Sequence, residues 1–337
     1  MKDKEKVEKL LNKLNNQYQR KNCQKVLNLA NKILKIDPEN NRALQLKLMT
    51  YSYINKSELG LEEIERIIKF NPESKEFYSF KGNFLSKVGK IKEAILAYNK
   101  YLSYYPDDEE IKQANINLMN SLNEDEDSLN FLKSLAKEDP NNLEIYPIIG
   151  SIYQEIDKDE EAIEFFDKYL ENPEKELYDD DKIKVVAMKI KSFKTLKQYD
   201  DALKLTDELI KEFEYEEEYY VVKAGLYEEL GEYYNALAIL DKIINKTPEH
   251  ILALREKGIV YLELKKYGDA IDCFQRVIDE SFFDCNYLMG TAYKGKGEYE
   301  KALEYLNNID EEIYDKESYQ QAQELIEEIE NEMDNEK

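Results

Sequence analysis

The chain has few of the residues on which catalytic and metal sites depend. Its 337 residues include one histidine, three cysteines and no tryptophan. A single histidine leaves too few ligands for a Cys/His zinc site within one chain. This residue, His250, follows Pro248 and Glu249 at a point where related segments carry helix-capping residues. We therefore interpret His250 as a turn or cap residue, and we predict no catalytic residue and no enzymatic activity.

Signatures of cofactor and metal binding are also missing. The cysteines, at positions 23, 273 and 285, are odd in number and form no CxxC pair, which indicates reduced thiols. No GxxxxGK[ST] loop occurs, and no GxGxxG follows a strand pattern. The acidic runs 124–127, 179–181 and 216–218 lack the spaced ligands and central glycine of a calcium loop. We expect no cofactor and no bound metal.

Long hydrophobic runs are absent as well. No stretch approaches the roughly 18 uncharged apolar residues of a transmembrane helix, and the first residues form no apolar signal segment. Apolar residues still make up 42% of the chain, enough for a packed core. We expect a folded cytoplasmic protein with no membrane partner.

What the sequence does contain is an internal repeat. Four of the seven prolines fall 34 residues apart, and a residue type that favours helix N-caps stands two positions after each of these four. Because proline cannot continue a helix, each proline predicts the end of one repeat and each cap the start of the next. The prolines are Pro38, Pro72, Pro106 and Pro140, and the predicted caps are Asn40, Ser74, Asp108 and Asn142.

Each repeat carries two helical patterns. In its second half, apolar residues recur in steps that place them on one helical stripe, with a small residue where two helices approach closely. One such stripe is Tyr267, Ala270, Ile271, Phe274, Val277 and Ile278. In the first half, a small residue precedes an aromatic by three positions. These pairs are Gly150/Tyr153, Ala224/Tyr227, Gly258/Tyr261 and Gly290/Tyr293.

These patterns resemble the tetratricopeptide repeat (TPR) family, whose unit is a helix–turn–helix of 34 residues with small and aromatic residues at fixed offsets. The resemblance covers nearly the whole chain. It implies an all-α, right-handed α-solenoid of about nine helix pairs with a C-terminal capping helix. The array spans residues 1–315, with repeats near 7–40, 41–74, 75–108, 109–142, 143–174, 183–216, 217–250, 251–282 and 283–314.

Two segments depart from the regular spacing. The alanines at equivalent positions of two successive repeats, Ala162 and Ala202, lie 40 residues apart, so we expect a longer connection or a local kink near 174–181. Beyond residue 315, one apolar stripe runs along an otherwise acidic helix. We expect 316–337 to be a capping helix and acidic tail, because the last repeat would otherwise expose its apolar side. The stripe consists of Tyr319, Ala322, Leu325, Ile326, Ile329 and Met333.

The net charge of −24 is unevenly distributed. Residues 1–100 hold 21 Lys+Arg against 12 Asp+Glu, whereas residues 101–337 hold 27 against 60. The acidic part disfavours general binding to nucleic acid, which needs clustered cations. The charge either serves solubility or makes the chain bipolar, with a basic end that meets an acidic partner and an acidic length that meets a basic one. Head-to-tail association into a homo-oligomer is a further alternative.

The resemblance also implies a binding face. In this family, partners usually lie along a concave face lined by the first helix of each repeat. The residues at inward positions include Gln45, Met49, Tyr53, Phe80, Asn83, Gln113, Asn117 and Asn120. Asn83 and Asn117 hold the same position in successive repeats, where amides can pair with both backbone groups of an extended peptide. Ordinary polar surface is the alternative interpretation.

The sequence therefore predicts a scaffold or adaptor that binds another protein or peptide in its concave groove. One alternative is a structural subunit of a larger complex, or a self-associating rod. A second is an accessory factor to an enzyme or RNA particle, bound through the basic N-terminal repeats. A third is an enzyme of unrecognised type, for which no residue is indicated.

Overall fold

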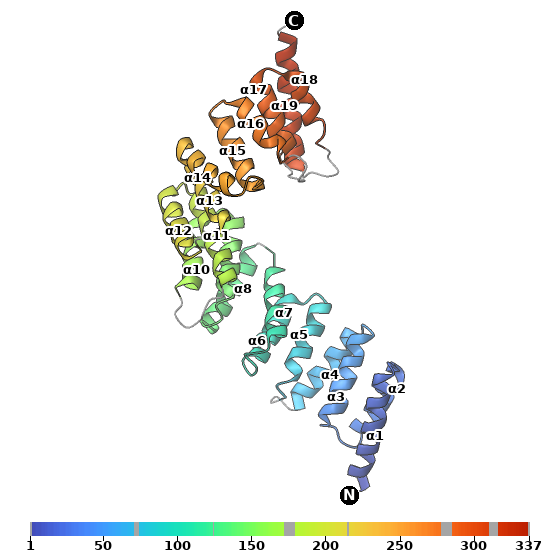
Figure 1. Ribbon diagram of the computed structural model, residues 1–337. Coiled ribbons are helices and arrows are strands. Elements are labelled where there is room, and N and C mark those ends of the chain that lie inside the picture. Colours follow the sequence, from blue (N-terminus) through green and yellow to red (C-terminus); the bar gives the residue numbers. More distant parts are fainter. Residues whose placement is uncertain are drawn as a thin grey trace. The chain divides into compact units, whose positions relative to one another are not determined.

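The computed structural model describes residues 2–70, 74–123, 125–171, 179–213, 216–277, 285–309 and 316–335. Within these ranges the chain forms helices and turns and no strand (Figure 1). It divides into two compact units, Met1–Asp157 and Lys158–Lys337, which we call the N-unit and the C-unit. The predicted all-α solenoid class is confirmed.

Helices follow one another along each unit, with short turns between them where the connecting residues are described. Those described in the N-unit are α1 (Lys2–Gln19), α2 (Cys23–Leu34), α3 (Asn41–Tyr53), α4 (Ser57–Phe70), α5 (Phe77–Lys87), α6 (Ile91–Leu102), α7 (Glu109–Asn120), α8 (Glu126–Glu138) and α9 (Ile145–Glu155). Those described in the C-unit are α10 (Asp159–Leu170), α11 (Asp179–Thr195), α12 (Tyr199–Glu212), α13 (Glu217–Glu229), α14 (Tyr233–Lys246), α15 (Ile251–Glu263), α16 (Tyr267–Gln275), α17 (Cys285–Lys296), α18 (Tyr299–Leu306) and α19 (Lys316–Asn335). None of these helices, over the described residues, has the length and apolar character needed to cross a membrane.

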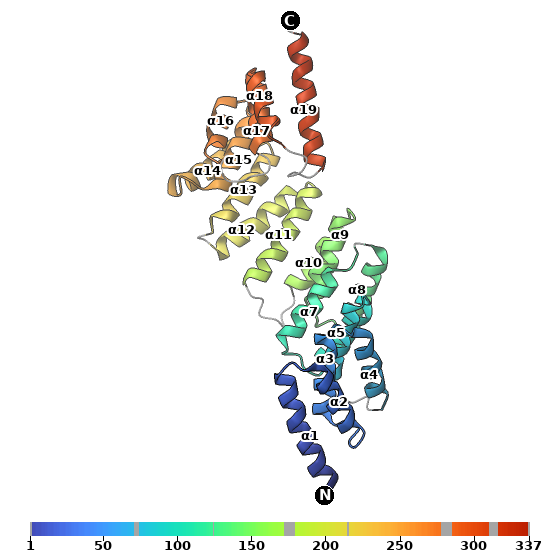
Figure 2. The same cartoon turned by 90° about the vertical axis from the view of Figure 1, so that its right-hand side faces the viewer.

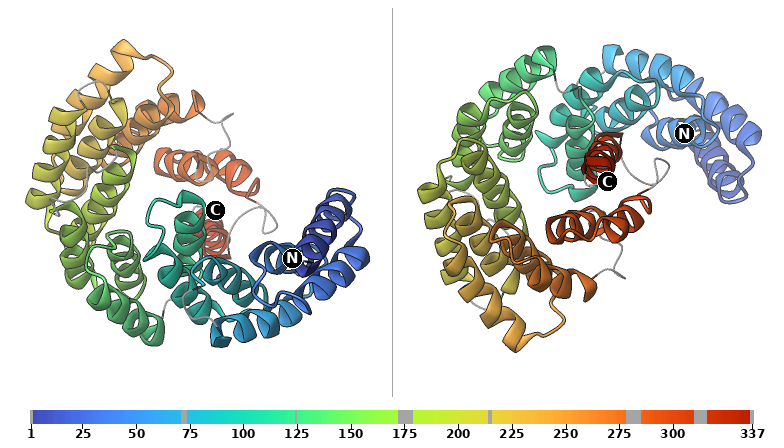
Figure 3. Two further views of the ribbon diagram at one scale, coloured as in Figure 1. Left: turned by 90° about the horizontal axis from the view of Figure 1, so that it is seen from below. Right: turned by 90° about the horizontal axis from the view of Figure 1, so that it is seen from above.

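The helices of each unit form two layers. Sequential helices pack together, as α11, α12 and α13 do (Figure 2), and several odd-numbered helices also contact the next odd-numbered helix. Such contacts join α1 to α3 and α7 to α9 in the N-unit, and α13 to α15 in the C-unit. No two even-numbered helices in the described ranges make a comparably extensive contact. Within each unit the odd-numbered helices therefore form the inner layer, and Figure 3 shows the layers in end-on views.

Small residues allow the two helices of a pair to approach closely. A Cβ atom at Gly82 of α5 would overlap the ring of Tyr98 on α6, and one at Gly258 of α15 would overlap the ring of Phe274 on α16. The same arrangement thus occurs in both units. The residues at the alanine position of the second helices are all buried, as the sequence predicts. They are Val26, Gly60, Ala94, Ser128, Ala162, Ala202, Ala236, Ala270 and Ala302.

Ion pairs join neighbouring helices in both units. In the C-unit, Lys257 of α15 reaches Asp241 of α14 at 2.6 Å, and Lys223 of α13 reaches Asp207 of α12 at 2.6 Å. The side chains of Lys223 and Lys257, 34 residues apart, are 22% and 18% exposed. In the N-unit, Lys47 of α3 is paired with a carboxylate of α4 at 2.6 Å and is only 7% exposed. The equivalent lysine is therefore more deeply buried in the N-unit.

Three predicted cap residues cap their helices. The Asn40 and Asp108 side chains accept the backbone N–H three residues further on, at 3.1 and 3.2 Å, and so begin α3 and α7. His250 Nδ1 accepts the N–H of Ala253 at 3.2 Å at the start of α15. The histidine Nε2 atom lies 3.7 Å from Glu217. Its predicted role as a turn or cap residue is confirmed.

The predicted caps Ser74 and Asn142 are wrong. Here α5 and α9 begin later, at Phe77 and Ile145, and their N-cap positions carry no side-chain capping bond. The Phe77 N–H donates to the Ser74 carbonyl at 3.2 Å, so a hydrogen-bonded turn precedes the helix. Residues that favour caps also favour such turns, which explains the error. Pro72 lies outside the described residues.

Part of the extra length between Ala162 and Ala202 is accounted for by the longer helix α11. Residues 172–178, where most of the expected connection falls, lie outside the described residues. From Asp179 onward the chain is already helical, so the expectation of a connection reaching residue 181 is wrong. Helix α11 contains 17 residues, whereas α13 and α15 contain 13 each. Extra residues thus lengthen α11 at its N-terminal end.

Helix α19 covers the last helix pair of the C-unit. Ala322 and Ile329 are fully buried in a cluster that includes Met289 of α17 and Leu306 of α18. Leu325 and Ile326 belong to the same cluster, with Tyr319 and Met333 partly buried against it. The apolar stripe of α19 therefore covers the end of the array, as expected of a capping helix.

Candidate functional site

The predicted groove residues lie on inner-layer helices of the N-unit. Helix α3 carries Gln45, Met49 and Tyr53, α5 carries Phe80 and Asn83, and α7 carries Gln113, Asn117 and Asn120. Gln45 and Phe80 are partly buried and the other six are exposed. Met49 is 39% and Tyr53 65% exposed, high values for large apolar side chains. These residues make up an accessible surface, which we call the N-face.

Polar residues of the N-face are bonded to near neighbours. The Asn117 Oδ1 atom accepts from Gln113 Nε2 at 3.1 Å. The Asn83 Oδ1 atom accepts from Ser52 Oγ at 3.5 Å. Burial raises the pKa of the Tyr98 hydroxyl, and a hydrogen bond with Asn83 partly opposes this effect. Both asparagines are thus positioned by residues of their own surroundings, and their pairing with a peptide backbone stays a prediction.

The two ends of the N-face have different chemistry. Near α1, the Tyr18 hydroxyl lies 3.8 Å from Met49 Sδ, and Lys21 lies over the Tyr53 ring at 6.0 Å. At the other end, Asn120 lines a small hollow of about 110 Å³ between α7 and α9. Its lining combines apolar residues such as Ile148 with the polar residues Ser151 and Glu155. The N-face therefore combines exposed aromatic, amide and apolar groups, which is a composition suited to protein contacts.

A larger hollow, which sequence reasoning missed, lies in the C-unit. It has a volume of about 670 Å³ and lies between α11 and α13, with residues of α12 also lining it. Its apolar lining includes Ile183, Ala187, Ile190, Leu209, Val221 and Val222. We call it the C-hollow. Since α11 and α13 belong to the inner layer, it opens on the layer that corresponds to the N-face.

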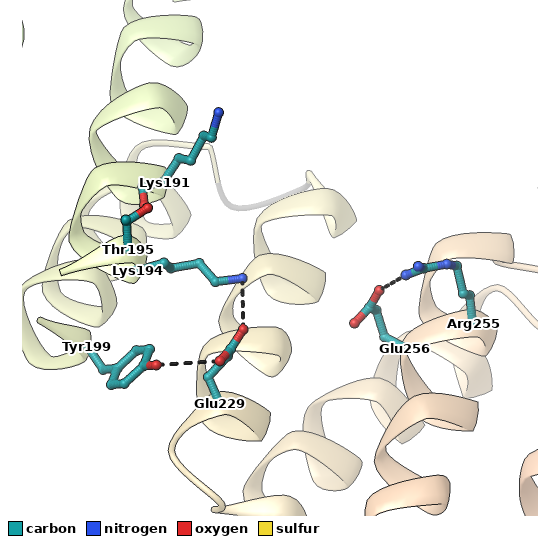
Figure 4. A network of polar contacts seen from close by, with 7 residues as sticks. All are labelled: Lys191, Lys194, Thr195, Tyr199, Glu229, Arg255 and Glu256. Carbon is teal, nitrogen blue, oxygen red and sulfur yellow. Dashed lines mark hydrogen bonds and ion pairs between the residues drawn. The ribbon is translucent and has the colours of Figure 1, made fainter. Parts of the chain in front are cut away.

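Charged residues surround the C-hollow. Lys194 on α11 and the Tyr199 hydroxyl both point toward Glu229 on α13, at 3.5 and 3.4 Å, as Figure 4 shows. Glu256 on α15 forms an ion pair with Arg255, while Lys191 points away from this group. Glu218 adds a further carboxylate to the lining. The C-hollow thus has cations on α11 and carboxylates on α13 and α15.

Several carboxylates lie close together next to the charged residues of the C-hollow. The pKa of Glu228 is raised to about 7, mainly by burial and then by the charges of Glu229, Glu263 and Glu256, which together outweigh the lowering effect of Lys194. A carboxyl pKa this high shows that the local environment disfavours another negative charge.

A glycine is the sequence feature that could have indicated the C-hollow. Gly225 stands at the ninth position of its repeat, next to the small residue Ala224 that the pattern requires. Other inner-layer helices carry side chains at the ninth position, such as Met49, Asn83 and Asn117. A glycine there removes a side chain from the inner surface. The sequence alone does not show whether neighbouring side chains fill that space.

Two features of the described residues bear on metal binding and on cysteine reactivity. Among the described residues, no group of three or more His, Cys, Asp or Glu side chains could hold a metal ion. Cys273 is 7% exposed, and burial raises the pKa of its thiol to about 11. A thiol with so high a pKa remains protonated near neutral pH and is a poor nucleophile.

Comparison with known families identifies the repeat. A tetratricopeptide repeat model matches residues 76–108, 143–175 and 283–311. A second model, described as subunit 3 of the anaphase-promoting complex or cyclosome, matches residues 195–277. No curated protein matches the chain significantly.

Several solved structures are similar at low sequence identity. A tetratricopeptide repeat protein from Parabacteroides merdae is 15% identical with a TM-score of 0.39, covering 85% of this chain and 98% of its own. The Cut9–Hcn1 hetero-tetramer of the anaphase-promoting complex gives 13% and 0.39, covering 88% and 85%. YrrB, a TPR protein described as having an unusual peptide-binding site, gives 18% and 0.37, covering 70% and 99%. The repeat pattern, the helix pairs and the matching family models together place this chain in the tetratricopeptide repeat family.

Proposed function

We propose that this protein is a scaffold or adaptor that holds a segment of a partner protein against its N-face. Tetratricopeptide arrays are in general scaffolds for protein–protein interaction and are typically not catalytic. The observation that carries the proposal is the exposure of Met49 and Tyr53 beside exposed amides on one inner layer. Exposed aromatic and methionine side chains are enriched where proteins meet.

The exposed amides could form hydrogen bonds with the backbone of the bound segment and so fix its orientation. Asn117 accepts one hydrogen bond from Gln113 and is otherwise exposed, and Asn83 occupies the same repeat position on α5. An asparagine side chain can donate to a carbonyl and accept from an N–H, so it can pair with the backbone of an extended segment. Tyr53 and Met49 would then contact apolar side chains of that segment.

A double variant tests this proposal. We expect Asn83→Ala with Asn117→Ala to weaken partner binding by about tenfold or more, since buried polar groups of the partner would lose their bonds. The matched control is Asn28→Ala with Asn130→Ala, which removes two exposed amides from the outer helices α2 and α8. Circular dichroism should show that both variants remain folded.

The measurement is affinity capture from native extract at low and moderate salt, with bound proteins identified by mass spectrometry. A specific protein that the N-face variant loses and the control retains would support the proposal. Equal retention by both variants would contradict it. Recovery of this chain alone would favour self-association instead of an adaptor role.

A further inference from the structure

The C-hollow presents apolar surface to solvent. Ala187 and Ile190 of α11 and Val221 and Val222 of α13 are part of its lining. Val222 is 40% exposed, although most large apolar residues of this chain are covered. A volume of about 670 Å³ provides room for one or more side chains of a bound segment. Covering this surface with an apolar group would be favourable.

Gly225 keeps the C-hollow open without serving the packing of the helices. A Cβ atom at this position would have its nearest neighbour, Glu256 Oε2, at 3.9 Å, which is ordinary contact distance. By contrast, a Cβ at Gly258 or Gly290 would overlap Phe274 or Leu306. Glycine inside a helix is destabilising relative to alanine. Close packing therefore explains Gly258 and Gly290, whereas the space beside Gly225 has no such explanation.

The charge around the C-hollow selects among possible occupants. Three carboxylates, Glu218, Glu229 and Glu256, line it from α13 and α15, against Lys191 and Lys194 from α11. The C-unit as a whole holds 24 Lys+Arg and 47 Asp+Glu, a net charge of −23. This field attracts cationic segments and repels acidic ones. Nucleic acid and anionic membrane surfaces are disfavoured for the same reason.

We infer that the C-hollow is a docking site for a basic segment of a partner protein, which inserts one apolar side chain beside Gly225. Lys and Arg residues flanking that side chain then face Glu218 on one side and Glu229 and Glu256 on the other. The apolar side chain supplies the specific contact, and the basic residues supply attraction and orientation. This inference rests on the proposed scaffold function but involves other helices than the N-face.

The test uses the full chain and labelled synthetic peptides of about ten residues, which in extended form can cross both α11 and α13. The first peptide carries a central Leu or Phe flanked by Lys and Arg. A second replaces the central residue by Ser, and a third replaces Lys and Arg by Glu. Binding is measured by fluorescence anisotropy, and hydrogen exchange detected by mass spectrometry locates the bound peptide.

Two variants of the chain separate shape from charge. Gly225→Leu fills the hollow, and its control, Gly268→Leu, adds the same side chain on α16, where a Cβ has no neighbour within 4 Å. Glu256→Gln removes one rim charge, and its control is Glu164→Gln at an exposed position of α10. Unchanged exchange protection in the free variants shows that they fold normally.

We expect the basic peptide with the apolar centre to bind about tenfold or more tightly than the Ser peptide, and the acidic peptide not to bind. Gly225→Leu should reduce affinity about tenfold, Glu256→Gln should reduce it severalfold at low salt, and both controls should leave it unchanged. The bound peptide should protect α11 and α13 from exchange.

Four results would overturn the inference. The first is equal binding of the Ser peptide, which would reflect charge alone, and the second is unchanged affinity in Gly225→Leu. The third is protection only of helices that do not line the C-hollow, and the fourth is no binding of the basic peptides at about 1 mM. A mass increase in sedimentation that Gly225→Leu abolishes would assign the hollow to a second copy of this chain instead. None of these results depends on Asn83 or Asn117, so they leave the N-face proposal to its own test.

Discussion

The two units share one repeat but present different inner surfaces. The N-unit holds 24 Lys+Arg and 25 Asp+Glu, a net charge of −1, whereas the C-unit carries −23. The N-face exposes amides with Met49 and Tyr53, while the C-unit has an apolar hollow bordered by carboxylates. The small and aromatic residues that pack the helix pairs occur in both units. Thus one set of helix positions determines the packing of the helix pairs, and another set determines the chemistry of the inner surface. One array can therefore have two kinds of binding surface.

The largest effect should come from the shared packing positions. Phe274 is fully buried and Tyr98 is 4% exposed, and each ring lies against a glycine of the preceding helix. We expect Phe274→Ala to lower the free energy of unfolding of the C-unit by about 3–5 kcal/mol, because it leaves a cavity beside Gly258. Tyr98→Ala should do the same to the N-unit. Urea unfolding measures the size of each effect.

Hydrogen exchange shows where each effect is felt. In a repeat array, each helix pair contacts only its neighbours, so a local loss of packing spreads over a limited distance. Phe274→Ala should speed exchange in α13–α18 and leave α3–α6 protected, and Tyr98→Ala should show the opposite pattern. If either variant speeds exchange equally in both units, they unfold as one cooperative body and their comparison as separate units fails.

An intermediate effect should distinguish the two kinds of ion pair. Lys47 and Glu63 are 7% and 15% exposed, and Lys257 and Asp241 are 18% and 51% exposed, with N–O distances of 2.6 Å in both pairs. Glu63→Gln leaves a buried lysine without its counter-ion and should cost about 3 kcal/mol. Asp241→Asn, in the more exposed pair, should cost about 1 kcal/mol or less.

The two lysines are otherwise well matched. Lys47 lies over the Tyr51 ring at 5.9 Å, and Lys257 lies over the Tyr261 ring at 5.6 Å. Burial is the largest single effect on the pKa of Lys257 and acts to lower it, but the hydrogen bond and charge of Asp241, together with Tyr261 and Cys273, raise the pKa overall. Urea unfolding of both variants gives the comparison. Equal losses, or a greater loss for Asp241→Asn, would show that burial does not set the strength of these pairs.

The sequence predicted the helix pairs well because each pair needs a small residue at a fixed place. A larger side chain at Gly82 or Gly258 would collide with a buried ring, so the repeat pattern directly reflects the packing. The caps at Ser74 and Asn142 were less predictable, because one hydrogen-bonded turn uses the same residue types as a helix start. The repeat pattern predicted which residues lie on the N-face, but it did not predict what those residues bind.

The C-hollow was not predictable from the same pattern. Its existence depends on the absence of a side chain at Gly225 and on how far the side chains of α11, α12 and α13 fill the space beside it. Helix α11 is longer than its counterparts, and residues before it fall outside the 34-residue period. A repeat pattern describes what neighbouring repeats share. It therefore contains little information about a site formed where one repeat differs from the others.

The smallest effect should be a difference in pH dependence at the carboxylate cluster of the C-unit. Glu228 has a pKa of about 7, because burial and the charges of Glu229, Glu263 and Glu256 outweigh the opposing effect of Lys194. The usual carboxyl value is 4.5. Between about 4.5 and 7 the folded state therefore binds more protons than the unfolded state. Stability from this group is greatest at low pH and falls as the pH rises through that window.

Glu228→Gln should remove this pH dependence, since glutamine has the same shape and does not titrate. We expect the variant to be more stable than the parent chain at pH 8, by about 1 kcal/mol at most after solvent screening, and the gain to vanish near pH 5. Urea unfolding from pH 5 to pH 8 measures the difference, with Glu164→Gln as the control at an exposed site. If Glu228→Gln and the control give parallel pH profiles, the carboxylates of the C-unit are no more crowded than ordinary surface charges. The contrast between the two units would then rest on the C-hollow and total charge alone.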